Sequence, residues 1–90
     1  MKTTKKCIVG KPDGIHIRTA RTIVEKANEF EANFTIIKAK NKDNPMNAKS
    51  MMELMQLEAL KGDKLIVKGD GEDAEDGVNA LVKIIEDENE

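Results

Sequence analysis

The residue of this 90-residue chain with the clearest capacity for chemistry is its only histidine, His16. It lies just before a segment patterned as an amphipathic helix, where backbone N–H groups lack intrahelical acceptors and the peptide dipoles present their positive end. Such a helix start binds anions, and phosphate is the anion that suits it best. Two residues later, Arg18 offers a permanently charged guanidinium that can bind phosphoryl oxygens in a bidentate way. A nucleophilic imidazole beside a phosphate cradle predicts a protein that carries phosphate on histidine.

The proposed chemistry requires a neutral ring nitrogen, which is available near neutral pH because histidine side chains have an ordinary pKa of about 6.5. Asp13 would oppose this chemistry if its carboxylate faced His16, because it would favour the imidazolium and repel phosphate. The segment Gly10–Gly14 is polar and rich in turn residues. We therefore expect Asp13 to turn outward, or to pair with Lys11 or Arg18.

The pattern of apolar residues predicts the elements that must position His16. Apolar residues recur at helical spacing from Thr19 to Phe30 and predict a helix there. Apolar runs bounded by turn residues predict strands over Lys5–Val9, Phe34–Ala39 and Lys64–Lys68, with a polar loop at Lys40–Pro45 and a further short strand near Met46–Ala48.

Ser50 opens a second predicted helix, which runs to about Leu57 and is stopped near Gly62. Residues 50–53 have the Ser-x-x-Glu form of a capping box, in which two side chains and two backbone donors satisfy one another. This capping role explains Ser50 without any regulatory function. The helix is apolar around most of its circumference: we expect Met52, Leu54 and Leu57 to face the core, and Met51 and Met55 to form an exposed patch beside His16.

A last helix is predicted from about Ala74 to Ile85, and the acidic residues that follow it are expected to fray, Glu90 included. Helices over an open sheet, in this order along the chain, make an α+β two-layer domain. We expect one such domain over residues 1–90.

Composition excludes several functional classes. Cys7 and His16 are single residues of their type and cannot supply a tetrahedral zinc site, so we predict no metal and no cofactor, and Cys7 is expected to be a small apolar strand residue. Residues 1–70 carry 14 basic and 9 acidic groups, whereas residues 71–90 carry 1 and 8. The acidic end and the absence of Trp and Tyr argue against nucleic-acid binding. No apolar run approaches the roughly 20 residues that cross a bilayer, so we predict a cytoplasmic protein without membrane insertion.

Two motifs resemble those of HPr, the histidine-containing phosphocarrier family of the bacterial sugar phosphotransferase system. Gly14-Ile15-His16, followed by Arg18 and Ala20, is similar to the active-site motif, and Asn47–Met52 is similar to the signature around the regulatory serine. The resemblance extends from about Lys5 to Ile85. It implies an open-faced two-layer sandwich in which a four-stranded antiparallel sheet is covered on one face by three helices.

The resemblance also implies a function. His16 would accept a phosphoryl group from enzyme I and pass it to a sugar-specific enzyme IIA, with Arg18 stabilising the phosphoryl group. Ser50 would be phosphorylated by an HPr kinase/phosphorylase, and the modified protein would bind a transcription factor of catabolite control. Ile17, Met51 and Met55 are expected to contact partners. The protein would then be a phosphoryl carrier and not an enzyme.

Three residues near His16 depart from the family pattern. The family usually has proline where Thr19 stands, a small residue or threonine where Ile17 stands, and a neutral polar residue where Asp13 stands. We expect Thr19 to supply an extra backbone donor or a local cap. These departures favour an alternative, a regulatory binding module of carbon catabolite control that acts through Ser50 with His16 inefficient or silent. An independent metabolic enzyme is disfavoured because the chain lacks a second histidine and a nucleotide-binding loop.

Overall fold

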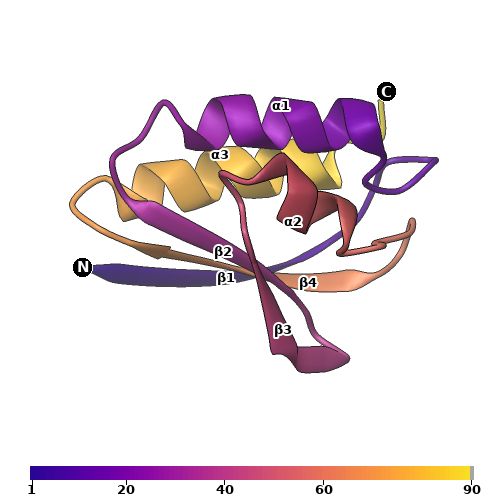
Figure 1. Ribbon diagram of the computed structural model, residues 1–90, viewed down its shortest axis with the longest axis horizontal. Coiled ribbons are helices and arrows are strands. Elements are labelled where there is room, and N and C mark those ends of the chain that lie inside the picture. The colour runs from indigo at the N-terminus through magenta and orange to yellow at the C-terminus, as the bar shows by residue number, and fades with distance from the viewer. Residues whose placement is uncertain (90) are drawn as a thin grey trace.

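The computed structural model describes residues 1–89 and has helices on one side of an antiparallel sheet (Figure 1). In chain order the elements are β1 (Lys2–Ile8), α1 (Ile17–Ala27), β2 (Asn33–Lys38), β3 (Asn41–Asn47), α2 (Met51–Met55), β4 (Lys64–Asp70) and α3 (Ala74–Glu86). The four strands are ordered β1-β4-β2-β3, and all three strand pairs are antiparallel. The α+β sandwich predicted from the sequence is confirmed.

The core lies between the helices and the covered face of the sheet. Alternate residues of β4, Leu65 and Val67, are buried in this core, while Ile66 belongs to the opposite face. Phe34 of β2 is the largest fully buried side chain, and its ring packs so closely on Gly77 of α3 that a Cβ at position 77 would overlap it. Cys7 is buried as predicted; this burial, aided by the Glu86 carboxylate, raises its thiol pKa to about 11 and leaves the group protonated.

The strand β3 begins at Asn41, within residues that we predicted to form a polar loop, so the loop prediction is wrong, whereas the short strand predicted near Met46–Ala48 corresponds to the end of β3. An edge strand needs no buried face, and every residue of β3 except Met46 is exposed. Its pairing with β2 also shifts register between Ile36 and Lys38. Pro45 lacks a backbone N–H but is tolerated because an edge strand has one unpaired side. Residues 41–45 therefore carried no alternation from which the first part of β3 could be recognised.

The helix α2 is shorter than predicted, ending at Met55 instead of near Leu57. Gly62 is not its C-cap: it has φ +90° in a later turn, where its N–H donates to the Val9 carbonyl over 2.8 Å. The first strand begins at Lys2 and not at Lys5, and α3 agrees with its predicted position.

The residues after α3 leave the helix at Asp87, and over the part that the structure describes they contact the loop before His16. The Lys11 ammonium donates to the Asn89 carbonyl at 2.7 Å and lies 3.9 Å from the Asp87 carboxylate. The Gly10 N–H also donates to the carbonyl of Ile85 at 3.0 Å. These contacts attach the end of the chain to the loop that precedes His16, while Glu90 lies outside the described residues.

Asp73, just before α3, joins this helix to the segment that leads into β2. Its carboxylate accepts hydrogen bonds from the N–H groups of Glu31 and Ala32, both at 2.9 Å. The bond from Glu31 is the main reason that the pKa of Asp73 is lowered, because it favours the charged form. The charged Asp73 carboxylate therefore stabilises the folded protein at pH values above the pKa of about 3.9 that the group has in the unfolded chain. This stabilisation is lost as the pH falls through the lower pKa of the folded state.

We expect Asp73→Asn to reduce the free energy of unfolding at neutral pH and to flatten its decline below about pH 4. Urea unfolding at a series of pH values, with the native protein in parallel, measures both effects. Equal acid dependence of the two proteins would show that Asp73 does not couple folding to proton binding.

Candidate functional site

His16 is the N-cap residue of α1. Its backbone is extended (φ −91°, ψ −175°), and its Nδ1 accepts a hydrogen bond from the Arg18 N–H at 3.2 Å. The helix begins at Ile17, two residues before its predicted start, so the ring itself caps the helix. Because Nδ1 accepts a hydrogen bond, the proton of the neutral ring is assigned to Nε2. The nitrogen with the free electron pair therefore faces the positive end of the helix.

The loop before His16 is held by contacts with the segment between α2 and β4. The Ile15 N–H donates to the Ala59 carbonyl at 2.9 Å, and the Ile15 side chain is buried. Gly14 adopts φ +71° and lies so close to Ala59 that a Cβ would overlap the Ala59 carbonyl oxygen. The position of the imidazole thus depends on a glycine that residues with side chains cannot replace without strain.

The neighbours of His16 differ in exposure. Arg18 is exposed, which leaves its guanidinium accessible to an incoming phosphoryl group. Thr19 is buried, and the helix cap belongs to His16, so the expectation that Thr19 forms a local cap is wrong. Its backbone N–H belongs to the first helical turn, where the helix supplies no acceptor, and its role as an extra donor stays a prediction.

Asp13 is exposed, in agreement with the outward arrangement that we expected. It does not pair with Lys11, whose ammonium binds Asp87 and Asn89 instead. Within residues 1–89, no ion pair joins Asp13 to Arg18. The carboxylate therefore takes no part in the hydrogen bonding of the ring.

Ser50 is the N-cap of α2, as predicted, but only half of the expected capping box is present. The Ser50 Oγ accepts a hydrogen bond from the Glu53 N–H at 3.2 Å. The Glu53 carboxylate accepts from the Asn47 N–H at 2.9 Å and not from the Ser50 N–H, which instead donates to the Asn47 carbonyl at 3.0 Å. The side chain of Glu53 therefore joins α2 to the end of β3.

Two of the three methionines of α2 face other directions than we predicted. Met52 is 75% exposed, although we expected it in the core, and Met51 is half-buried against the core, although we expected it at the surface. Residues three apart share a helix face, so burial of Leu54 turns Met51 inward, and Met52 and Met55 outward. Met55 is 42% exposed, as expected.

Two further apolar side chains are exposed: one is adjacent to His16 in the sequence, and the other belongs to the segment that contacts the loop before His16. Ile17, the first residue of α1, is 65% exposed, in accord with the prediction that it contacts partners. Leu60, also 65% exposed, follows the Ala59 carbonyl that binds the Ile15 N–H. Leu60 could not be singled out from the sequence because a lone leucine in a loop gives no periodic signal. We refer to Ile17, Met52, Met55 and Leu60 as the apolar surface residues.

The family model described as the PTS HPr component phosphorylation site matches residues 3–87 of this chain. The chain belongs to the HPr family. The phosphocarrier protein HPr of Borreliella burgdorferi is 34% identical over 82 residues, which make up 91% of this chain and 92% of that relative. The predicted resemblance is thus confirmed, and with it the general role of a phosphocarrier of the phosphotransferase system.

Solved structures of HPr proteins have the same fold. A phosphocarrier protein HPr from Bacillus anthracis superposes with a TM-score of 0.85 at 31% identity, over 93% of this chain and 96% of that chain. Crh, the catabolite repression HPr of Bacillus subtilis, superposes with a TM-score of 0.72 at 29% identity, over 97% of this chain and 100% of that chain.

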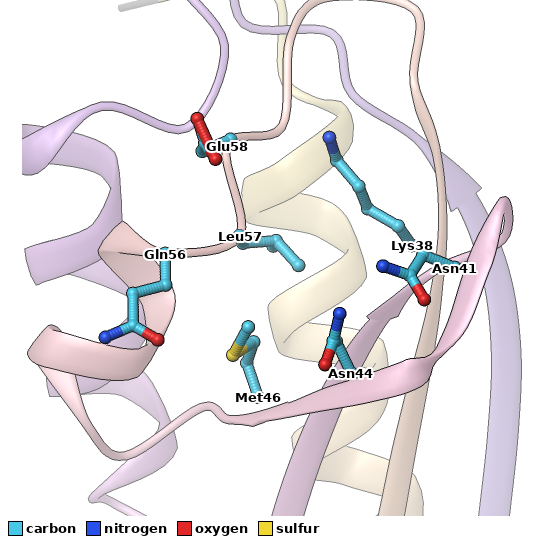
Figure 2. A pocket seen from close by; sticks show the side chains of 7 residues that line it. All are labelled: Lys38, Asn41, Asn44, Met46, Gln56, Leu57 and Glu58. Carbon is cyan, nitrogen blue, oxygen red and sulfur yellow. The ribbon is translucent and has the colours of Figure 1, made fainter.

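A polar pocket of about 180 Å³ lies apart from His16, between the β2–β3 hairpin and the residues that follow α2 (Figure 2). Its lining residues are Lys38, Asn41, Asn44, Met46, Gln56, Leu57 and Glu58.

Among residues 1–89, no three His, Cys, Asp or Glu side chains are grouped so as to hold a metal ion. No helix of this part of the chain is long and apolar enough to cross a membrane.

Proposed function

We propose that His16 is the phosphoryl carrier of this HPr protein, accepting the group from enzyme I and passing it to a sugar-specific enzyme IIA in the cytoplasm. The observation that supports this proposal most is the placement of Nδ1 at the start of α1, within hydrogen-bonding distance of the Arg18 N–H. The half-buried ring is still reachable from solvent, as transfer between proteins requires. Membership of the HPr family supports the choice of donor and acceptor.

The geometry favours attack by Nδ1. The electron pair of Nδ1 forms a bond to phosphorus as the bond to the donor breaks, and Nε2 keeps its proton. The Arg18 N–H then loses its ring acceptor and is free to donate to a phosphoryl oxygen, as is the adjacent Ile17 N–H at the helix start. The phosphoryl group carries roughly two negative charges, which these donors, the helix dipole and the Arg18 guanidinium stabilise.

Transfer to the acceptor reverses these events. The bond between Nδ1 and phosphorus breaks as the acceptor forms its own, and Nδ1 recovers the hydrogen bond from the Arg18 amide. The same donors stabilise both the free and the phosphorylated ring. This arrangement suits a carrier, because it keeps the phosphoryl group transferable in both directions.

The apolar surface residues would form the docking site for enzyme I and enzyme IIA. We expect Met52→Ala to raise the KM of enzyme I for this protein by about tenfold, since an exposed side chain that packs on a partner contributes on the order of 1 kcal/mol. The matched control is Met51→Ala, which removes the same atoms from a half-buried position and should mainly lower stability. Equal effects of the two variants on KM would argue against a docking role for Met52.

Ser50 would provide regulation of the same surface. Its phosphorylation by an ATP-dependent HPr kinase/phosphorylase would place charge beside the exposed Met52 and Met55, and so oppose apolar docking there. The likeness to Crh supports the alternative in which binding to a catabolite-control transcription factor through Ser50 is the main function and His16 is inefficient or silent.

The experiment that separates these functions is incubation with phosphoenolpyruvate and enzyme I from the same cell, followed by mass spectrometry. We expect the gain of a single phosphate that is labile in acid and stable in base, and that is lost in His16→Ala. No gain, together with ATP-dependent modification that is lost in Ser50→Ala, would favour the regulatory alternative. A gain that persists in His16→Ala would place the phosphate on another residue.

A further inference from the structure

The face of the sheet that the helices leave uncovered combines lysines with a small apolar centre. Directly opposed residues of an antiparallel pair lie on the same face. The pairings therefore place Lys6, Ile66 and Ile37 in one row across β1, β4 and β2. The rows on either side contain Ile8 with Lys64, and Thr4 with Lys68 and Thr35. We call these eight residues the open face; Figure 1 shows that all the helices lie on the other side of the sheet.

One end of the open face is hollowed. A depression of about 430 Å³ is lined by the basic residues Lys6, Lys42 and Lys64 and by the apolar residues Ile8 and Ile66. It extends around the strand ends, where Cys7 and Leu65 of the covered face also line it. Ile8 is 50% exposed even though it belongs to a strand, whereas Ile66 and Ile37 retain only 8% and 5% exposure beneath the longer side chains around them. Glu86 also lines the depression, but one of its carboxylate oxygens already accepts a hydrogen bond from the Ile8 N–H at 3.2 Å.

The lysines of this face are not neutralised within the molecule. In the described part of the chain, the ion pairs involve Lys11, Arg21, Lys26 and Lys38 and no lysine of the open face. One exposed carboxylate, that of Asp70, lies on this side of the sheet, in the next row, opposite Lys2. Most other acidic groups follow residue 70 and belong to α3 or its ends in the other layer. The open face thus has an excess of positive charge around an apolar depression.

We propose that the open face is a docking surface for an acidic peptide segment of a partner protein. Carboxylates of the segment pair with Lys6, Lys64 and Lys68, and an apolar side chain enters the depression over Ile8 and Ile66. Lysines on the edge strand β1 could serve only to prevent pairing with another sheet, but Lys64 and Lys68 lie on the interior strand β4, where no edge needs protection.

The chemistry of this face favours a peptide over a nucleic acid. Single-stranded nucleic acids stack their bases on aromatic side chains, and the two phenylalanines of this chain pack against each other on the covered side, with ring centroids 5.9 Å apart. Both arginines belong to α1. The open face is also separate from His16, which caps the start of α1 in the helix layer, so an acidic partner and a phosphoryl donor can bind together.

The test is titration of the isotope-labelled protein with a synthetic decapeptide of alternating glutamate and valine, followed by amide NMR shifts. We expect shifts in β1, β4 and β2, a Kd below about 1 mM and weaker binding at high salt. The double variant Lys6→Glu/Lys64→Glu should weaken binding at least about tenfold, while phosphorylation at His16 is unchanged. The matched control, Arg21→Glu/Lys83→Glu, changes the net charge equally but on α1 and α3 in the helix layer, and should bind like the native protein.

Several results would overturn the proposal. These are the absence of saturable binding, shifts confined to α1 and α2, and equal binding of a lysine–valine decapeptide. Tighter binding of an oligothymidylate of matched charge would assign the face to nucleic acid. Sedimentation equilibrium that showed association of the protein with itself through this face would assign it to a second copy of the chain.

Discussion

Replacement of Arg18 by alanine is expected to lower the rate of phosphoryl transfer through His16 by about a hundredfold without changing the melting temperature. Loss of one well-placed donor to a developing charge typically costs a factor of 10²–10³ in rate, and a guanidinium on a surface loses part of its strength to solvent. The stability should not change because the Arg18 side chain is exposed and makes no ion pair within residues 1–89. The backbone N–H that binds Nδ1 remains in the variant.

Arg21 offers a matched control one turn further along α1. Its side chain is 76% exposed and pairs with Glu25 at 3.5 Å, so Arg21→Ala removes the same charge away from the ring. Single-turnover transfer from phosphorylated enzyme I, with thermal unfolding in parallel, compares the two variants. Comparable losses in both would mean that general electrostatic attraction, and not contact of Arg18 with phosphate, governs the rate. Arg18→Lys should recover only part of the activity, because an ammonium cannot bind in a bidentate way.

The features that could be predicted from the sequence are those that leave a periodic or local chemical signal. The apolar spacing after Thr19 predicted α1, and the placement of His16 before it predicted a ring at a helix start. The start of α1 at Ile17 was missed because Ile17 and Arg18 are exposed and add nothing to the apolar stripe. This small difference matters, since it makes His16 the cap residue instead of a neighbour of the cap.

Other features depended on tertiary contacts that a single sequence does not display. The inward face of α2 is selected by burial of Leu54, and this selection exchanges the predicted positions of Met51 and Met52. The Glu53 carboxylate accepts a hydrogen bond from the Asn47 N–H because β3 ends beside α2. The first part of β3 could not be recognised in the sequence because its residues are polar and exposed. The place of the exposed Leu60 near His16 follows from the hydrogen bond between Ala59 and the loop of His16, a tertiary contact that the sequence does not display.

The second large effect concerns Gly14, which connects the fold to the position of His16. We expect Gly14→Ala to destabilise the protein by more than the roughly 1–2 kcal/mol that a left-handed backbone costs a residue with a Cβ. The new methyl group would overlap the Ala59 carbonyl oxygen and lie 2.9 Å from Leu60 Cα, and backbone atoms cannot rotate away as a side chain can. The loop must then withdraw from Ala59, which weakens the bond from the Ile15 N–H and displaces the imidazole.

Gly62 separates the two contributions. It has φ +90°, and a Cβ built there meets nothing within 4 Å, so Gly62→Ala carries the backbone strain without the overlap. Urea unfolding should show a larger loss for Gly14→Ala than for Gly62→Ala, and phosphorylation by enzyme I under native conditions should fall only in Gly14→Ala. A misplacement of about 1 Å can cost a transfer reaction on the order of a hundredfold. If both variants lost the same stability and neither lost activity, the contact with Ala59 would not be what positions His16.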